Sequence, residues 1–318
     1  MIISASRRTD IPSYYSDWFF RRIREGFVYV RNPMNFHQIS KVSLNPDVVD
    51  GIVFWTKNPA PMIDRLDELK DYPYYFQFTL TSYTGDVEAH LPPKSDVLIP
   101  AFQRLADKIG PARVIWRYDP ILVNQKYTSD YHIEYFDKLA RRLQGYTEQC
   151  TISFIDMYRN TMKNARDMDF AEVSEQGQHE LAKALADIAH GCGLKLEACA
   201  EPVDFSQYGI GRARCIDDRL FERISGYPLK IVKDRNQRLE CGCVSSIDIG
   251  MYNTCRNGCR YCYANYNSQT VESNWQAHDG GSPLISGHVN DDDVITERKA
   301  VSNRDKQISF FRERIEPR

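Results

Sequence analysis

The chain has 318 residues, of which 42% are hydrophobic and 26% are charged, and its formal net charge is −2. This composition is typical of a globular protein, because disordered chains have fewer apolar residues and a larger net charge. The near-neutral charge excludes tight binding of nucleic acids or anionic membranes through bulk charge, whereas a local basic patch leaves nucleic-acid binding open.

Short strands alternate with amphipathic helices along most of the sequence. Strands are predicted at residues 2–4, 51–55, 76–80, 114–116, 152–155, 194–198 and 246–252. Helices are predicted between them, at about residues 16–25, 58–69, 98–109, 133–143 and 181–191. This alternation favours an α/β fold with a parallel sheet and right-handed crossovers. Seven strands in about 250 residues suit a complete or partial (β/α) barrel of the TIM type.

Composition divides the chain into three parts. Residues 1–245 are expected to form the barrel, with an inserted hairpin near residues 27–50. Residues 246–266 supply a last strand and a cysteine-rich loop that complete the barrel, and residues 267–318 form a polar tail that wraps the surface. No stretch is apolar enough to span a bilayer, and the first residues lack the apolar core of a signal peptide. We therefore expect a cytoplasmic protein with no membrane partner.

The most informative stretch contains Cys255, Cys259 and Cys262, with Tyr261 before the last cysteine and Tyr-Ala after it. Three thiolates in so short a loop can each bind one iron of a [4Fe-4S] cube and leave the fourth iron open. An open coordination position distinguishes a reactive metal site from a structural one. Zinc is the alternative metal, but it prefers four ligands in paired motifs, which this spacing fits poorly.

This cysteine spacing resembles the cluster motif of the radical S-adenosylmethionine (radical SAM) superfamily, and the Cys-Tyr-Ala ending resembles its spore photoproduct lyase branch. The resemblance implies that Cys255, Cys259 and Cys262 bind a [4Fe-4S] cluster whose open iron chelates S-adenosylmethionine. It further implies reductive cleavage of this cofactor to a 5′-deoxyadenosyl radical. The electron would come from a donor such as a flavodoxin or ferredoxin, and the substrate is unknown.

The motif stands near the C-terminus, whereas in most of the superfamily it follows the first barrel strand. A circularly permuted barrel explains this position, with residues 246–252 acting as the first strand and residues 2–5 as its neighbour. The full chain also resembles an uncharacterised bacterial family, described only as a domain of unknown function, that has the same cysteine pattern.

A second group of cysteines precedes the motif and consists of Cys199, Cys215, Cys241 and Cys243. Placed at strand ends and in loops, these thiols could bind an auxiliary iron–sulfur cluster or a zinc ion. The alternative is that they are simply buried, as free cysteines often are. Cys150 and Cys192 are expected to be packing residues.

Polar residues recur where the predicted strands end. In a parallel barrel these ends meet at one mouth, so we expect them to bind the cofactor or the substrate. Together with Tyr261, the candidates are Arg7, Arg8, Asp10, Lys57, Asn58, Arg117, Asp119, Asp156 and Glu201. Arginine suits a carboxylate, and the acidic residues suit a ribose diol or an amino group. The structural alternatives are a helix cap for Asn58 and an ion pair between Arg117 and Asp119.

Three functions remain open from the sequence. The first is a radical-SAM-like iron–sulfur enzyme acting on an unknown small-molecule or other substrate. The second is a non-catalytic zinc or iron–sulfur protein with a redox-sensing role. The third is a nucleic-acid repair enzyme, for which Arg21, Arg22 and Arg24 or Arg212 and Arg214 would have to supply a basic patch.

Overall fold

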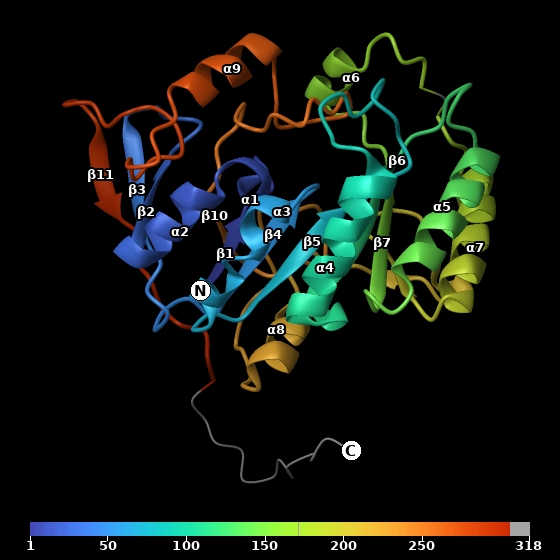
Figure 1. Cartoon of the computed structure of the whole chain (residues 1–318), viewed down its shortest axis with the longest axis horizontal. Helices are drawn as coiled ribbons and strands as arrows, with labels where there is room; N and C mark the ends of the chain where they lie inside the picture. Colours follow the sequence, from blue (N-terminus) through green and yellow to red (C-terminus); the bar gives the residue numbers. More distant parts are fainter. Residues whose placement is uncertain (171, 306–318) are drawn as a thin grey trace.

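The computed structural model describes residues 1–170 and 172–305 (Figure 1). Its main sheet has eight strands in the order β10-β1-β4-β5-β6-β7-β8-β9, and all neighbouring strands are parallel. The strands are β1 Ile2–Ala5, β4 Gly51–Thr56, β5 Tyr74–Thr79, β6 Val114–Ile121, β7 Gln149–Phe154, β8 Lys195–Ala198, β9 Gly211–Arg212 and β10 Ile247–Asp248. The predicted α/β class and the parallel sheet are confirmed.

Helices connect the strands and flank the sheet (Figure 1). They are α1 Ile11–Tyr14, α2 Ser16–Glu25, α3 Ala60–Ile63, α4 Ile99–Ile109, α5 Ser129–Leu143, α6 Arg159–Asn164, α7 Glu175–Gly191, α8 Asp218–Ser225 and α9 Ser268–Gln276. Shorter helical turns are η1 Leu66–Leu69, η2 Lys94–Leu98, η3 Pro111–Arg113 and η4 Ser206–Tyr208. The side chains of Thr128 and Ser174 cap α5 and α7. α2 ends at Gly26, whose left-handed conformation closes the helix.

The helix predicted after Asn58 is divided into α3 and η1, because Arg65 between them leaves the helical conformation. Met62, Ile63, Leu66 and Leu69 are nevertheless all buried in the same apolar cluster. The spacing of apolar residues thus correctly identified the buried face, although the backbone is not one continuous helix.

β10 pairs in parallel with β1, with Ile3 opposite Ile247 and Ser4 opposite Asp248. The strand that leads into the cysteine loop therefore adjoins residues 2–5, as predicted. β10 is shorter than expected, since only Ile247–Asp248 join the ladder. β10 and β9 stand at opposite ends of the strand order, and no pairing joins them within residues 1–170 and 172–305, so the sheet is open there.

A second sheet of three strands lies at the side of the molecule (Figure 1, left). β2 Phe27–Arg31 and β3 Gln38–Ser43 form an antiparallel hairpin within the segment expected to contain one. β11 Val294–Glu297, from the polar tail, adds to β3 in parallel. The tail thus contributes a strand, and also the helix α9, in addition to irregular chain. None of the described helices has the length and apolar character that a bilayer crossing requires.

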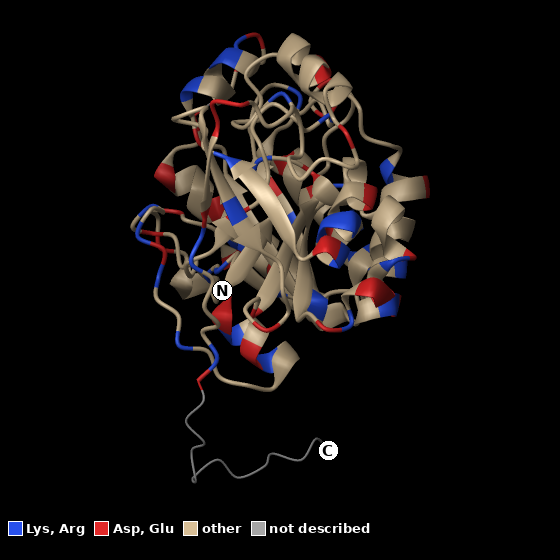
Figure 2. Cartoon of the chain, turned by 90° about the vertical axis from the view of Figure 1, so that its left-hand side faces the viewer, with Lys and Arg blue, Asp and Glu red and all other residues tan. Residues whose placement is uncertain are grey.

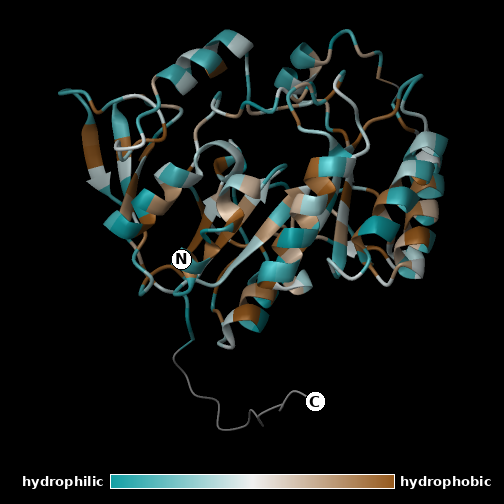
Figure 3. Cartoon of the chain, in the orientation of Figure 1, coloured by the Kyte–Doolittle hydropathy of each residue, from teal (hydrophilic) through white to brown (hydrophobic). Residues whose placement is uncertain are grey.

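The two faces of the main sheet carry separate apolar clusters, and hydrophobic residues are concentrated along its strands (Figure 3). On one face Ile3, Phe54, Phe76 and Trp116 pack in the large cluster with residues of α2, α4, α5 and α7. Their chain neighbours Ile2, Val53, Tyr75 and Ile115 belong to a smaller cluster on the opposite face, because strand side chains alternate. That cluster is completed by α8 and the irregular chain after β9, including Cys215, Ile216, Phe221, Cys241 and Cys243. We call this second side the inner face.

Basic and acidic residues are interspersed over the side of the molecule shown in Figure 2. The arginines proposed as a basic patch on α2 have carboxylate partners: Arg21 and Arg22 pair with Glu25 at 2.9 and 2.8 Å, and Arg24 pairs with Glu68 at 2.7 Å. Arg22 is also fully buried. These arginines therefore do not form an uncompensated basic surface.

Candidate metal centre

Cys255, Cys259 and Cys262 lie in the loop that follows β10, at the carboxyl edge of the parallel sheet. Main-chain contacts fix this loop against the chain after β5. Glu88 and Cys259 form an antiparallel bridge, and the Arg260 amide donates to the Val87 carbonyl at 2.8 Å. The middle of the loop is thus positioned by backbone hydrogen bonds.

Glycine is required at one point of this loop. Gly258 has a φ of +68°, and a Cβ at this position would lie 2.9 Å from Nδ1 of His90. The His90 amide donates to the Asn257 carbonyl at 3.2 Å, which holds the two segments this close. The backbone conformation of residues 255–259 therefore depends on packing against His90 as well as on the cysteines.

Two asparagines bind carbonyl groups of the loop. Nδ2 of Asn164 donates to the carbonyls of Cys262 and Asn265, both at 2.8 Å. Nδ2 of Asn265 donates to the Cys255 carbonyl, also at 2.8 Å. The backbone at two of the three cysteines is therefore held by side-chain amides, so the protein itself preorganises the loop.

The three thiols are partly shielded from solvent. Burial raises the pKa of Cys255 well above its ordinary value, with smaller contributions from Asp10 and the other two cysteines. Burial also raises the pKa of Cys259, to about 12, and that of Cys262. Thiols in this environment are poor free nucleophiles, whereas a bound metal cation would hold them as thiolates.

A buried ion-pair network stands beside Cys259. Nζ of Lys57 lies 2.8 Å from Oε1 of Glu88 and 2.7 Å from the Tyr261 hydroxyl, which itself donates to Glu88 at 2.5 Å. Lys94 and Thr81 also donate to Glu88, at 2.6 and 2.8 Å. Burial alone would raise the pKa of Glu88, but the two ammonium groups lower it to about 2. The cysteine loop is thereby joined to a carboxylate that is ionised at neutral pH.

Sequence reasoning missed Glu88 and Lys94. Both lie in the chain between β5 and α4, outside any motif and away from a predicted strand end. The feature that marks Glu88 is its burial beside two lysines, which is a property of the tertiary structure.

Asp10, Lys57 and Tyr261 are brought together around the cysteine loop. The carboxylate of Asp10 accepts hydrogen bonds from the Lys57 amide at 2.8 Å, Nδ2 of Asn257 at 3.0 Å and the Ser13 amide at 3.1 Å. Its pKa is raised by burial, although these donors counteract the effect. Asp10 therefore links α1, β4 and the cysteine loop.

Arg7, Arg117 and Asp119 gather on the inner face. The guanidinium groups of Arg7 and Arg117 lie 5.4 and 5.2 Å from the centre of the Trp55 ring. Arg117 is buried, forms an ion pair with Asp119, and donates to the sulfur of Cys215 at 2.8 Å. The predicted ion pair between Arg117 and Asp119 is present, and a cysteine of the second group is part of it.

The remaining candidates have partners outside the two groups just described. They are Arg8, Asn58, Asp156 and Glu201. Arg8 lies over the Tyr252 ring at 5.1 Å, Oδ1 of Asn58 accepts from the Ala60 amide at 3.2 Å, Asp156 pairs with Arg238 at 2.8 Å, and Glu201 accepts from the Phe154 amide at 2.8 Å. Asn58 is not the cap residue of α3, which is Pro59, although its side chain binds the first amide of that helix. Burial raises the pKa of Glu201 to about 7.

The second cysteine group converges on the inner face. The sulfurs of Cys199 and Cys215 are 3.2 Å apart. The Cys243 sulfur accepts from the amide of Ile216, the residue after Cys215, at 3.4 Å, and Cys241 is buried in the same apolar cluster. The interaction with Cys243 lowers the pKa of Cys241 to about 7. All nine cysteines are free thiols, and Cys150 and Cys192 are buried as expected.

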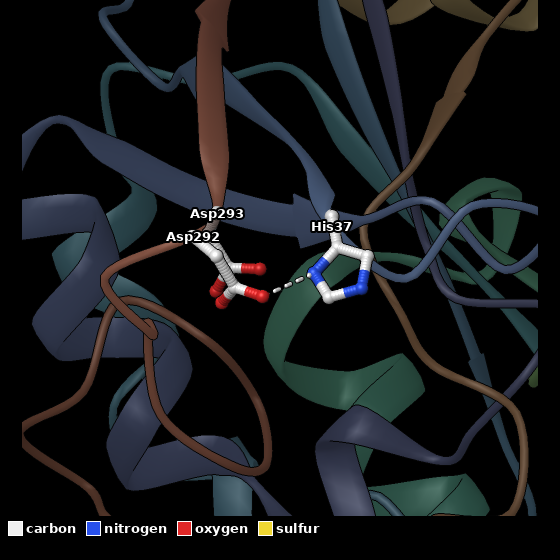
Figure 4. A group of neighbouring side chains, drawn as sticks. All are labelled: His37, Asp292 and Asp293. Carbon is white, nitrogen blue, oxygen red and sulfur yellow. Dashed lines mark ion pairs between the residues drawn. The ribbon is translucent and has the colours of Figure 1, made fainter.

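Within residues 1–170 and 172–305, the one group that brings three potential ligand atoms within 4.8 Å of one another is His37, Asp292 and Asp293 (Figure 4). Nδ1 of His37 lies 3.0 Å from Asp292, and Asp293 is engaged by Arg31 at 2.6 Å. His37 and Asp292 are exposed, and the ion pairs already account for the carboxylates. This group joins β3 to the tail and does not resemble either cysteine site.

A family model described as "Domain of unknown function (DUF1848)" matches residues 2–264. This range includes the whole parallel sheet and both cysteine groups. No curated protein matches the chain significantly. Because the matched region covers most of the 318 residues, the chain belongs to the DUF1848 family.

Proposed function

We propose that this chain is a radical-SAM-type iron–sulfur enzyme. The observation that supports the proposal most strongly is the single preorganised loop that carries Cys255, Cys259 and Cys262 at the carboxyl edge of a parallel sheet. Three thiols rather than four leave one metal position without a protein ligand, which suits a reactive centre.

The donor set fits an iron–sulfur cluster. The three thiols are shielded and of raised pKa, so they need a cation to ionise, and Lys57 adds positive charge beside Cys259. Cys255, Cys259 and Cys262 would hold the cluster, which when bound and reduced would supply the electron that cleaves S-adenosylmethionine to a 5′-deoxyadenosyl radical. The protein's own part is to position the loop and to limit access of water to the thiolates.

S-adenosylmethionine also requires a cation for its carboxylate and acceptors for its ribose. Arg8 suits the carboxylate, because it adjoins the loop through Tyr252 and its ion pair with Asp248 is long, at 3.9 Å. Glu201, at the end of β8, suits the ribose. We retain Asp156 and Asp119 as further candidates at the same edge of the sheet.

The order of strands supports a partial, circularly permuted (β/α) barrel. β10 adjoins β1, and the strands from β4 to β9 follow in chain order, as in such a barrel. We further propose a cytoplasmic location with a flavodoxin or ferredoxin as electron donor. Nine free thiols and an oxygen-sensitive cluster both suit a reducing compartment.

The test is anaerobic reconstitution with iron and sulfide, followed by incubation with dithionite and S-adenosylmethionine. We expect 5′-deoxyadenosine to form in the wild type and in the control Cys192→Ala, and to be lost in Cys259→Ala together with the brown colour. Retained cofactor cleavage in Cys259→Ala would refute the proposal. A single zinc per chain with no iron after anaerobic purification would instead establish the non-catalytic alternative.

A further inference from the structure

We propose that Cys199, Cys215, Cys241 and Cys243 form a second, four-thiolate metal centre, separate from the loop of Cys255, Cys259 and Cys262. Its occupant is a thiophilic metal, either one zinc ion or an iron–sulfur cluster. Both are bound by four cysteine thiolates, and the experiment below distinguishes them. This inference does not depend on the proposed function.

The four thiols come from three separate parts of the chain. Cys199 follows β8, Cys215 follows β9, and Cys241 and Cys243 lie in the irregular chain before β10. The sulfurs of Cys199 and Cys215 lie 3.2 Å apart, and the Cys243 sulfur accepts from the amide of Ile216, the residue after Cys215, at 3.4 Å. Cys241 and Cys243 belong to the same apolar cluster as Cys215, and Cys199 packs against it. If these positions only filled space, any small apolar residue would serve there. The convergence of four cysteines from distant segments therefore favours a role for their sulfur atoms.

The surroundings are suited to negative charge on the sulfurs. Arg117 is buried and donates to the Cys215 sulfur at 2.8 Å, and Arg7 lies near Cys215 and Cys243. Nη2 of Arg7 is buried and has no hydrogen-bond partner within residues 1–170 and 172–305. A divalent ion bound by four thiolates carries a net charge of about −2. Asp119 already pairs with Arg117, so the guanidinium groups of Arg7 and Arg117 would offset part of this negative charge.

The lack of helices and strands in the chain before β10 also favours a metal crosslink. Between α8, which ends at Ser225, and β10, which begins at Ile247, the described chain contains no helix or strand. Irregular connections of this length are uncommon in compact domains unless something else holds them. Yet this chain covers the inner face, where Cys241, Cys243 and Val244 are buried. A metal bound to Cys241 and Cys243 on one side and to Cys199 and Cys215 on the other would fasten it to the sheet.

Four protein ligands leave no open coordination position, so this centre would hold the inner face together or carry an electron, without binding substrate directly. Arg7 connects the two cysteine groups. Its carbonyl accepts from the hydroxyl of Tyr263, the residue after Cys262, at 2.8 Å, while its guanidinium interacts electrostatically with Cys215 and Cys243.

The experiment measures iron, acid-labile sulfide and zinc per chain after anaerobic purification of full-length variants. The triple variant Cys255→Ala/Cys259→Ala/Cys262→Ala removes the loop thiols and should retain one metal centre. Adding Cys241→Ala/Cys243→Ala should abolish the remaining metal, whereas adding the control Cys192→Ala should not. Zinc without iron identifies a zinc site, and iron with sulfide identifies a cluster.

X-ray absorption at the metal edge of the triple variant provides a readout that does not require further substitution. We expect four sulfur neighbours around the metal. A metal-free triple variant, a Cys199–Cys215 disulfide in protein kept reduced, or a metal coordinated by other than sulfur atoms would each overturn the proposal. If Cys241→Ala/Cys243→Ala loses metal while the triple variant matches the wild type, the second centre stands and the proposed function fails.

Discussion

Glu88 and Cys259, 171 positions apart in the sequence, are joined by an antiparallel main-chain bridge. The Glu88 carboxylate binds the ammonium groups of Lys57 and Lys94, at 2.8 and 2.6 Å. The middle cysteine of the loop is therefore attached to a buried cluster in which two ammonium groups share one carboxylate. Any change in this cluster should affect both folding and metal retention.

Replacing Glu88 by glutamine should be strongly destabilising. The substitution leaves Lys57 buried without its carboxylate, and breaking a buried ion pair typically costs about 3–5 kcal/mol. Urea unfolding should show this loss, and the variant should also retain less iron after reconstitution. Glu134→Gln, which breaks the exposed pair with Lys138, is the matched control and should cost less than about 1 kcal/mol. Equal stability of the two variants would contradict the importance of the buried network.

His132 should make the protein less stable in mild acid. The ring is fully buried, with its nitrogens at 2.8 Å from the Tyr118 hydroxyl and the Leu122 carbonyl, and burial lowers its pKa to about 4. The unfolded chain takes up a proton below about pH 6.5, but the folded protein does so only near pH 4. The free energy of unfolding is therefore unaffected by protonation of His132 above about pH 6.5. It decreases as the pH falls toward 4, by about 2 kcal/mol at pH 5.

The check is denaturant unfolding at pH 7 and pH 5 for the wild type and for His132→Gln. The difference in stability between the two pH values should be smaller in the variant by about 2 kcal/mol. An equal pH dependence in both proteins would show that His132 is not held neutral in the fold.

Gly51 should not tolerate alanine. A Cβ at this position would lie 2.0 Å from the ring of Phe221, where α8 packs against the start of β4. Overpacking of this kind typically costs about 1–3 kcal/mol. Gly85→Ala is the control, because a Cβ there meets nothing within 4 Å. Phe221→Leu should partly relieve the cost in the double variant, and strict additivity of the two changes would contradict direct contact.

Asp248 should be needed to join β10 to β1. Its carboxylate accepts from the hydroxyls of Ser4 and Ser6, at 2.9 and 2.6 Å, and from the Arg7 amide at 2.8 Å. Asp248→Asn replaces one carboxylate oxygen by an amide NH2 group, which cannot accept a hydrogen bond from these donors. The free energy of unfolding should fall by about 1–3 kcal/mol. Ser4→Ala removes one donor only and should cost less. Thermal unfolding distinguishes the two, and a milder effect of Asp248→Asn would be evidence against this role.

Part of the candidate site could be predicted from residue pattern alone. The spacing of Cys255, Cys259 and Cys262 is local, so it indicated a candidate metal-binding loop without knowledge of the fold. The apolar spacing within residues 98–109 likewise indicated the buried face of α4. By contrast, the convergence of Cys199, Cys215, Cys241 and Cys243 depends on how three distant segments pack, and their dispersed positions left burial and metal binding equally open.

Period and composition by themselves determined the α/β class and the parallel sheet, because alternation of apolar residues is encoded over a few neighbouring positions. The last strand was expected beside residues 2–5 from the permutation that the resemblance of the cysteine motif implies. The tertiary structure decided that the sheet is open between β9 and β10, that Arg117 contacts Cys215, and that Glu88 stands behind Cys259. The physical reason is that burial and charge pairing between distant segments arise only when the chain is folded. A sequence pattern shows which side chains are present, whereas the packing of distant segments determines which of them are in contact.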